Sequence, residues 1–182
     1  MRKLQYPLLL LVIAQTFCSC QRLTVERNES AAVLNGRTVA ALNRLRDETN
    51  AQYGYRQGVP RVNLGPCGRF AKIFREQWNA RFPEKTNIAL VMSGDGSFCH
   101  HVLVKLPSGS YFDGGNGVIS EDQLLKIYPG SRIEVMLNFD MKVLDQRSYG
   151  LKREYPICPN YSDELTSRMI VNCLSSLSND WR

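Results

Sequence analysis

The chain has 182 residues, of which 43% are hydrophobic and 22% are charged. This length allows one domain with a buried core, and this composition excludes a chain that is disordered throughout. The formal net charge is +6 at pH 7, but the basic residues are scattered through the first half instead of forming a block, so the charge gives no sign of a nucleic-acid-binding protein.

The first 20 residues have the pattern of an export signal. Two basic residues precede the apolar run 8–14, which is too short to span a bilayer. The Phe-Cys-Ser-Cys sequence that follows resembles a bacterial lipobox in which Cys20 carries the lipid. We therefore expect an export signal over 1–20, followed by a single domain over 21–182. The protein would be a periplasmic or outer-membrane lipoprotein in a bacterium, with an ordinary secreted protein as the alternative.

The first part of the domain predicts two helices. Apolar residues recur at helical spacing from Val39 to Leu45, with Thr38 as a candidate cap and Gly54 as a plausible end. From Cys67 onward an aromatic residue recurs at every fourth position, which is typical of a buried helix face. These aromatic residues are Phe70, Phe74, Trp78 and Phe82.

After residue 83 the apolar pattern changes to that of short strands. Strands are expected over 88–92, 98–106, 111–113 and 132–139. Ser120 and Gln123 form a capping box for a short helix that ends at Ile127, and an amphipathic helix is expected between Leu165 and Leu177. Helices followed by an antiparallel sheet predict an α+β domain.

Cys67 stands where a loop enters the aromatic helix. The unpaired N–H groups and the dipole at this end of a helix favour a thiolate, and Gly65 and Gly68 leave room for a substrate backbone. Cys67 is therefore the candidate nucleophile. Its own N–H is a candidate oxyanion donor, and Asn63, which precedes it in the same loop, is a second one. A buried or disulfide-bonded cysteine is the alternative.

The tripeptide Pro-Ser-Gly at 107–109 decides how the strands on either side of it pair. Proline and serine suit the central positions of a type I turn, and Gly109 suits the left-handed position of a G1 bulge. In that three-residue loop Leu106 pairs with Ser110. A two-residue turn would shift every pair and remove the arrangement that follows from it.

With this register, His101 and Asp113 are diagonal neighbours on one face of the sheet, within reach of each other. His100 falls on the opposite face, with Val102, and is the poorer candidate for catalysis. We therefore expect Asp113 to orient His101, which would act as general base for Cys67.

These residues together resemble the papain-like superfamily of cysteine hydrolases. The matching elements are a Gly-x-Cys-x-x-Phe-Ala helix start, a His-Val-x-Val strand and a Gly-x-Tyr-x-Asp strand, in this order within residues 63–117. The resemblance is to the circularly permuted or transglutaminase-like branch, which includes bacterial cell-wall amidopeptidases.

The resemblance implies a papain-like core, with a central helix that carries cysteine packed on an antiparallel sheet that carries histidine and aspartate. It implies Cys67 as nucleophile, His101 as base and Asp113 as orienting acid, without a cofactor. The implied activity is that of a peptidase or amidase, or of a transglutaminase-like acyltransferase. Together with an export signal it favours a peptide or peptidoglycan-like substrate.

The other cysteines allow different interpretations. Cys158 and Cys173 are close in sequence and are predicted to form a disulfide in an oxidising compartment. A disulfide between Cys67 and Cys99 would make the chain a non-catalytic exported lipoprotein or binding domain. A zinc site that adds the two adjacent histidines to these two cysteines is disfavoured, because neighbouring strand residues point to opposite faces. We therefore expect no metal.

Overall fold

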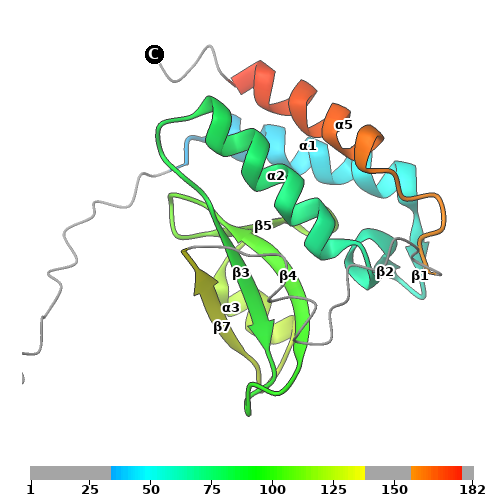
Figure 1. The fold of residues 1–182 in the computed structure, drawn as a ribbon, viewed down its shortest axis with the longest axis vertical. Coiled ribbons are helices and arrows are strands. Elements are labelled where there is room, and N and C mark those ends of the chain that lie inside the picture. Colours follow the sequence, from blue (N-terminus) through cyan, green and yellow to red (C-terminus); the bar gives the residue numbers. More distant parts are fainter. Residues whose placement is uncertain (1–33, 138–156, 178–182) are drawn as a thin grey trace, which may run out of the picture. The chain divides into compact units, whose positions relative to one another are not determined.

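A computed structural model describes residues 34–137 and 157–177, which form an α+β domain (Figure 1). The predicted export signal, the lipidation candidate Cys20 and the end of the strand predicted over 132–139 lie outside the described residues. None of the helices in the described part combines the length and hydrophobicity needed to cross a membrane.

The centre of the domain is a five-stranded antiparallel sheet in the order β6-β5-β4-β3-β7. Its strands are β3 (Asn87–Met92), β4 (Cys99–Lys105), β5 (Tyr111–Asp113), β6 (Gly117–Ile119) and β7 (Arg132–Met136). Four of them were predicted. The fifth, β6, has only three residues, too few for an alternating pattern to be recognised in the sequence.

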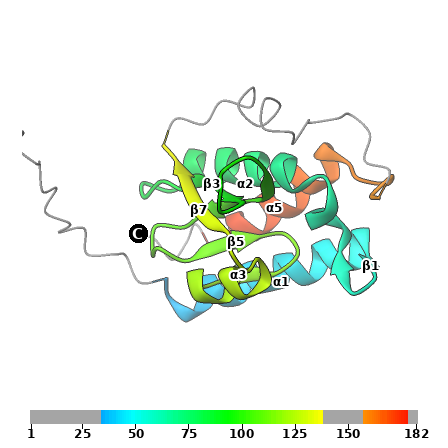
Figure 2. The same cartoon turned by 90° about the horizontal axis from the view of Figure 1, so that it is seen from below.

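Helices cover both faces of this sheet. On one face lie α1 (Gly36–Tyr53), α2 (Cys67–Arg81) and α5 (Asp163–Leu177), with α5 between the other two (Figure 2). On the other face lies α3 (Glu121–Ile127), whose Leu124 is buried against Ala89 and Leu103.

The aromatic repeat of α2 fixes this helix over β4 and β5. All four of its aromatic residues are buried, as predicted. The ring of Phe74 lies 4.6 Å from that of Phe112 in β5, and the ring of Trp78 lies 4.6 Å from that of Phe82. Burying one such side chain stabilises the fold by about 1.5–3 kcal/mol. This packing determines where Cys67, the first residue of α2, is placed relative to the sheet.

The ends of α1 differ in part from the prediction. Asn35 caps the helix, because its side chain accepts a hydrogen bond of 2.8 Å from the N–H of Thr38. The prediction of Thr38 as the cap was therefore wrong by three residues. The predicted end is confirmed, since Gly54 follows the helix at a φ of 74° and its N–H binds the carbonyl of Asn50.

Two short strands, β1 (Tyr55–Arg56) and β2 (Val59–Pro60), and the 3-10 helix η1 (Arg61–Leu64) connect α1 to α2. The two residues of the β1–β2 turn, Gln57 and Gly58, have φ values of 51° and 79°. Positive φ at both positions is the mark of a type I′ hairpin turn. This hairpin brings η1, and with it Asn63, to the start of α2.

Candidate catalytic site

The loop between β4 and β5 has the predicted conformation. Gly109 has a φ of 87°, and the N–H of Leu106 donates to the carbonyl of Ser110 over 2.8 Å. Lys105 pairs with Tyr111, which is the register of a three-residue loop with a G1 bulge. The prediction that this bulge sets the pairing is confirmed.

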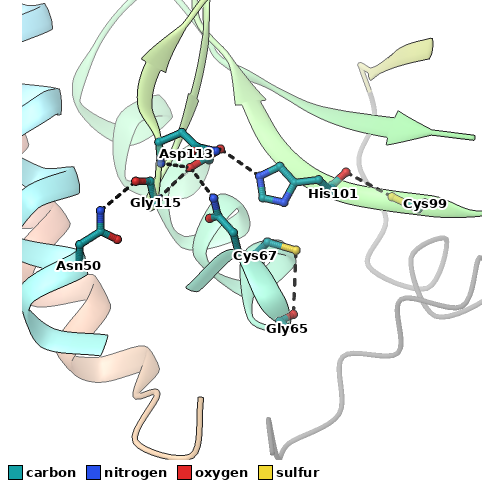
Figure 3. A network of polar contacts seen from close by, with 9 residues as sticks. Asn50, Gly65, Cys67, Cys99, His101, Asp113 and Gly115 are labelled. Atoms are coloured by element: carbon teal, nitrogen blue, oxygen red, sulfur yellow. Dashed lines mark hydrogen bonds and ion pairs between the residues drawn. The ribbon is translucent and has the colours of Figure 1, made fainter. Parts of the chain in front are cut away.

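In this register the side chains of His101 and Asp113 meet. Nε2 of His101 lies 3.0 Å from Oδ2 of Asp113, and both residues are buried, with exposures of 0% and 2% (Figure 3). Burial alone would lower the pKa of His101, but the hydrogen bonds and negative charges of Asp113 and Cys67 outweigh it and raise the pKa above 6.5. The imidazolium form is therefore favoured.

Asp113 is held by donors on both carboxylate oxygens. Oδ1 accepts from Asn63 Nδ2 at 3.1 Å, from the N–H of Gly115 at 2.8 Å and from the N–H of Asn116 at 2.5 Å. Oδ2 accepts from Asn116 Nδ2 at 2.9 Å as well as from His101. Burial would raise the pKa of Asp113, but His101 and the N–H groups of Asn116 overcome that effect and lower it. The carboxylate therefore stays ionised although it is buried.

Cys67 lies on the other side of the imidazole. Figure 3 shows its sulfur beside the ring nitrogen that does not contact Asp113. That nitrogen, Nδ1, has no hydrogen-bond partner among the described residues, and the thiol of Cys67 points to the carbonyl oxygen of Gly65, 4.0 Å away. The nearby Cys67 nevertheless raises the pKa of His101. The imidazole thus lies between Asp113, bonded at Nε2, and Cys67, which is on the Nδ1 side. This orientation is opposite to that of the chymotrypsin triad, where Nε2 faces the nucleophile.

The start of α2 leaves backbone donors next to the thiol. The first N–H that binds within this turn is that of Phe70, which donates to the carbonyl of Pro66 over 2.9 Å. The N–H groups before it, beginning with that of Cys67, have no intrahelical acceptor. They are suitable donors for a developing oxyanion.

Asn63 is part of the site, but its contact is with Asp113. The structure places one of its N–H groups on Oδ1 of that carboxylate, and its own Oδ1 is buried without a hydrogen bond in the described part. Its role as an oxyanion donor stays a prediction. The observed contact makes it a residue that positions Asp113.

His100 does not lie on the face that the simple alternation predicted. A bulge interrupts the β3–β4 pairing, so that Val91 pairs with His101 and Met92 pairs with Cys99, and His100 is the extra residue. Its ring lies 6.2 Å from that of Tyr128 and 5.2 Å from that of Phe98. The bulge also turns Cys99 into the same core as Val102, which regular alternation would not do.

Tyr128 is a site residue that the sequence analysis missed. It follows the last residue of α3, and its half-buried ring stacks on the imidazole of His101 with a centroid distance of 5.7 Å and an interplanar angle of 17°. The capping box at Ser120 predicted the start and end of this helix, and both are confirmed. No sequence signal indicated that Tyr128, the residue after this helix, would contact His101 in β4.

Two glycines that follow Asp113 were also missed. A Cβ atom on Gly114 would lie 2.7 Å from the ring of Phe70, and one on Gly115 would lie 2.5 Å from Nδ2 of Asn63. The turn that carries Asp113 is therefore pressed against α2 and η1, where a side chain has no space.

All four cysteines in the described part are free thiols. The predicted Cys158–Cys173 disulfide is absent, because the two thiols face different neighbours: that of Cys158 faces the side chain of Asn160, and that of Cys173 donates to the carbonyl of Ala41 in α1. The alternative Cys67–Cys99 disulfide is absent as well, since the thiol of Cys99 donates to the carbonyl of His101 over 3.3 Å.

Comparisons of the chain with protein-family models, with curated proteins and with solved structures give no match. The interpretation of this site therefore rests on its own geometry and chemistry.

Proposed function

We propose that this protein is a cysteine hydrolase, a peptidase or amidase, in which Cys67, His101 and Asp113 form the catalytic triad. The observation that carries the proposal is the placement of one buried imidazole between an ionised carboxylate, 3.0 Å from Nε2, and a thiol at the first residue of a helix. A thiol beside an imidazole at the start of a helix is the setting in which cysteine nucleophiles are activated.

In the first half of the reaction the thiolate of Cys67 attacks the carbonyl carbon of an amide. The oxyanion that forms accepts a hydrogen bond from the N–H of Cys67, and the imidazolium of His101 gives its Nδ1 proton to the leaving amine. The C–N bond breaks, and a thioester and a neutral imidazole remain.

In the second half the neutral imidazole removes a proton from water, whose oxygen attacks the thioester. The C–S bond breaks, which releases the carboxylic acid and regenerates the thiolate of Cys67 and the imidazolium of His101. An amine in place of water would give a transglutaminase-like acyl transfer with the same residues. Asp113 keeps the imidazole oriented and stabilises its charge in both halves.

The proposal includes an exported location and a peptide or peptidoglycan-like substrate. It is supported there by the N-terminal sequence, with its basic residues and apolar run 8–14, and by the resemblance within residues 63–117. Attachment to a membrane through lipid on Cys20 is the alternative to release after signal cleavage.

Labelling with a small thiol-reactive electrophile tests the proposal without knowledge of the substrate. The chain supplies an internal comparison, because Cys173 is more exposed than Cys67 while burial and the charge of Glu48 raise the pKa of Cys173 to about 11. We expect Cys67 to react faster than Cys173 at neutral pH, as measured by mass spectrometry of the labelled peptides. If Cys67 were not activated, the labelling rates would follow exposure, and Cys67 would react more slowly than Cys173.

The two adjacent histidines provide matched variants for this experiment. His101→Ala should remove the fast labelling of Cys67, whereas His100→Ala should leave it unchanged, because the ring of His100 contacts Tyr128 and Phe98 instead of Asp113. Equal loss in both variants, or fast labelling in His101→Ala, would contradict the proposed triad. Thermal unfolding of each variant shows whether it is folded.

A further inference from the structure

The imidazole of His101 is constrained on its edges and on one face. Its edges meet Asp113 at Nε2 and Cys67 at Nδ1, and its face is covered by the ring of Tyr128 at 5.7 Å. These three contacts come from the end of β5, the start of α2 and the residue that follows α3. The first two define the reaction, and the third has no part in the mechanism given above.

We propose that Tyr128 is a positioning residue for His101: its stacked ring keeps the imidazole between Asp113 and Cys67 and favours the protonated imidazole. The inference rests on the proposed function for its catalytic meaning, while the effect on His101 itself can be measured independently of catalysis.

The surrounding structure holds Tyr128 in place. Ser120 and Gln123 form a complete capping box at the start of α3, with bonds of 3.2 Å and 3.0 Å. Leu124 is fully buried on the same side of the sheet as His101, and the hydroxyl of Tyr111 in β5 binds Glu121 over 3.0 Å. Helix α3 is held by its first turn and by its buried face. Tyr128, the residue that follows it, is therefore fixed in position.

Stacking restricts the motion that would disrupt the site. Rotation of the imidazole about its bond to Cβ would separate Nε2 from Asp113 and Nδ1 from Cys67 at the same time. A ring parallel to the imidazole within 17° occupies the space through which the imidazole edge would turn. The stacked ring of Tyr128 therefore helps to keep the imidazole next to both Asp113 and Cys67.

The ring also favours a positive charge on its neighbour. A cation within about 6 Å of the centroid of an aromatic ring is attracted by the negative potential of its face. Burial and the charge of Asp113 raise the pKa of Tyr128, so its phenol stays neutral over the pH range in which His101 is titrated. Asp113 and Cys67 raise the pKa of His101, and the Tyr128 ring at 5.7 Å would act in the same direction. The neighbouring titratable groups are Cys99, whose thiol donates to the carbonyl of His101, and His100, whose ring lies 6.2 Å from that of Tyr128.

The test is an NMR titration of the imidazole signals, which is simple because the chain contains two histidines. A Cys67→Ser background removes the coupled thiol titration, so the result does not depend on whether Cys67 is a nucleophile. His100→Gln assigns the His101 signal. In Tyr128→Leu, which keeps an apolar cover over the imidazole, we expect the protonation midpoint of His101 to fall by about 0.5–1 pH unit.

Conservative variants separate the ring from the hydroxyl. Tyr128→Phe keeps the stacked ring and should keep the wild-type midpoint, and Tyr128→Trp should keep it or raise it. Tyr55→Leu, a substitution at an exposed tyrosine in β1, is the control and should change nothing. The proposed role of the ring is wrong if the protonation midpoint of His101 in Tyr128→Leu equals that of wild type. It is also wrong if Tyr128→Phe lowers this midpoint as much as Tyr128→Leu does.

The labelling assay then links this result to the proposed function. With Cys67 present, Tyr128→Leu should lower the labelling rate of Cys67 about 2- to 10-fold at neutral pH, with Tyr128→Phe at the wild-type rate. A shifted midpoint together with an unreactive Cys67 in every protein would support Tyr128 as a positioning residue and contradict the proposed hydrolase. A reactive Cys67 with unshifted midpoints would do the opposite.

Discussion

Replacing Asp113 by asparagine is the sharpest perturbation of the site, because both carboxylate oxygens act only as acceptors. Oδ1 receives three hydrogen bonds and Oδ2 receives two. An amide has one acceptor oxygen and one donor nitrogen, so one of the two sets of bonds must be lost. The nitrogen will take the Oδ2 position, where fewer donors lose their acceptor.

The cost follows from the bonds at that position. Asn116 Nδ2 loses its acceptor, and a buried donor left without one costs about 1–3 kcal/mol of folding stability. Nε2 of His101 avoids the same penalty by becoming an acceptor, which moves the imidazole proton to Nδ1. That proton then faces Cys67, and the imidazole can no longer accept the thiol proton. Asp→Asn in a Ser-His-Asp triad costs about 10⁴-fold in kcat by the same tautomer change.

We therefore expect Asp113→Asn to remain folded but to lose most of the fast labelling of Cys67, by about 10²–10⁴-fold. Urea unfolding gives the free energy of unfolding, and peptide mass spectrometry gives the labelling rate. Asp95→Asn is the matched control, because it makes the same change in an exposed turn, where the partners of Asp95 in the described part of the chain are Ser93 and Ser97. A wild-type labelling rate in Asp113→Asn would refute the role of Asp113 and the orientation assigned to the imidazole.

Three further predictions follow from the same geometry. The pKa of His101 is raised on folding, so its contribution to stability is complete below about pH 6.5 and is lost as the pH rises through the folded value. The difference in free energy of unfolding between wild type and His101→Gln, measured in urea, should therefore shrink as the pH increases above 6.5. Gly115→Ala should reduce labelling of Cys67, because a Cβ would lie 2.5 Å from Asn63 Nδ2. Gly109 has free space around it but a φ of 87°. Gly109→Ala should therefore lower folding stability by about 1–2 kcal/mol and leave labelling of the folded protein unchanged. In protein that is denatured without a reductant, an alkylating reagent should modify all four cysteines of the described part. A pair of cysteines that stays unmodified would show that a disulfide forms.

Much of the site was predictable because it depends on short-range rules. The type of turn at 107–109 sets the strand register, and the register brings Asp113 to His101. The aromatic repeat from Phe70 onward identified the buried face of α2 and so the place of its first residue. In each case a local pattern of a few residues determines a contact one element away.

The remaining features depend on contacts that no local pattern encodes. The bulge at His100 arises in the pairing of β3 with β4, and it changes the direction of Cys99 without any glycine or proline to mark it. Tyr128 reaches His101 only because α3 folds back across the sheet. The Cys158–Cys173 prediction used distance along the chain, whereas the three-dimensional neighbours of the two thiols decide whether they can join.

The distribution of the triad over α2, β4 and β5 makes its chemistry a property of the completed fold. Cys67 obtains its base only when α2 has docked on the sheet, and the base obtains its orientation only when β4 and β5 have paired around the Gly109 bulge. Under the proposed mechanism, an unfolded chain carries an ordinary cysteine with no special reactivity. A brief pulse of electrophile during refolding would therefore count the molecules in which these three elements have come together, and so report the time course of assembly from within the catalytic site.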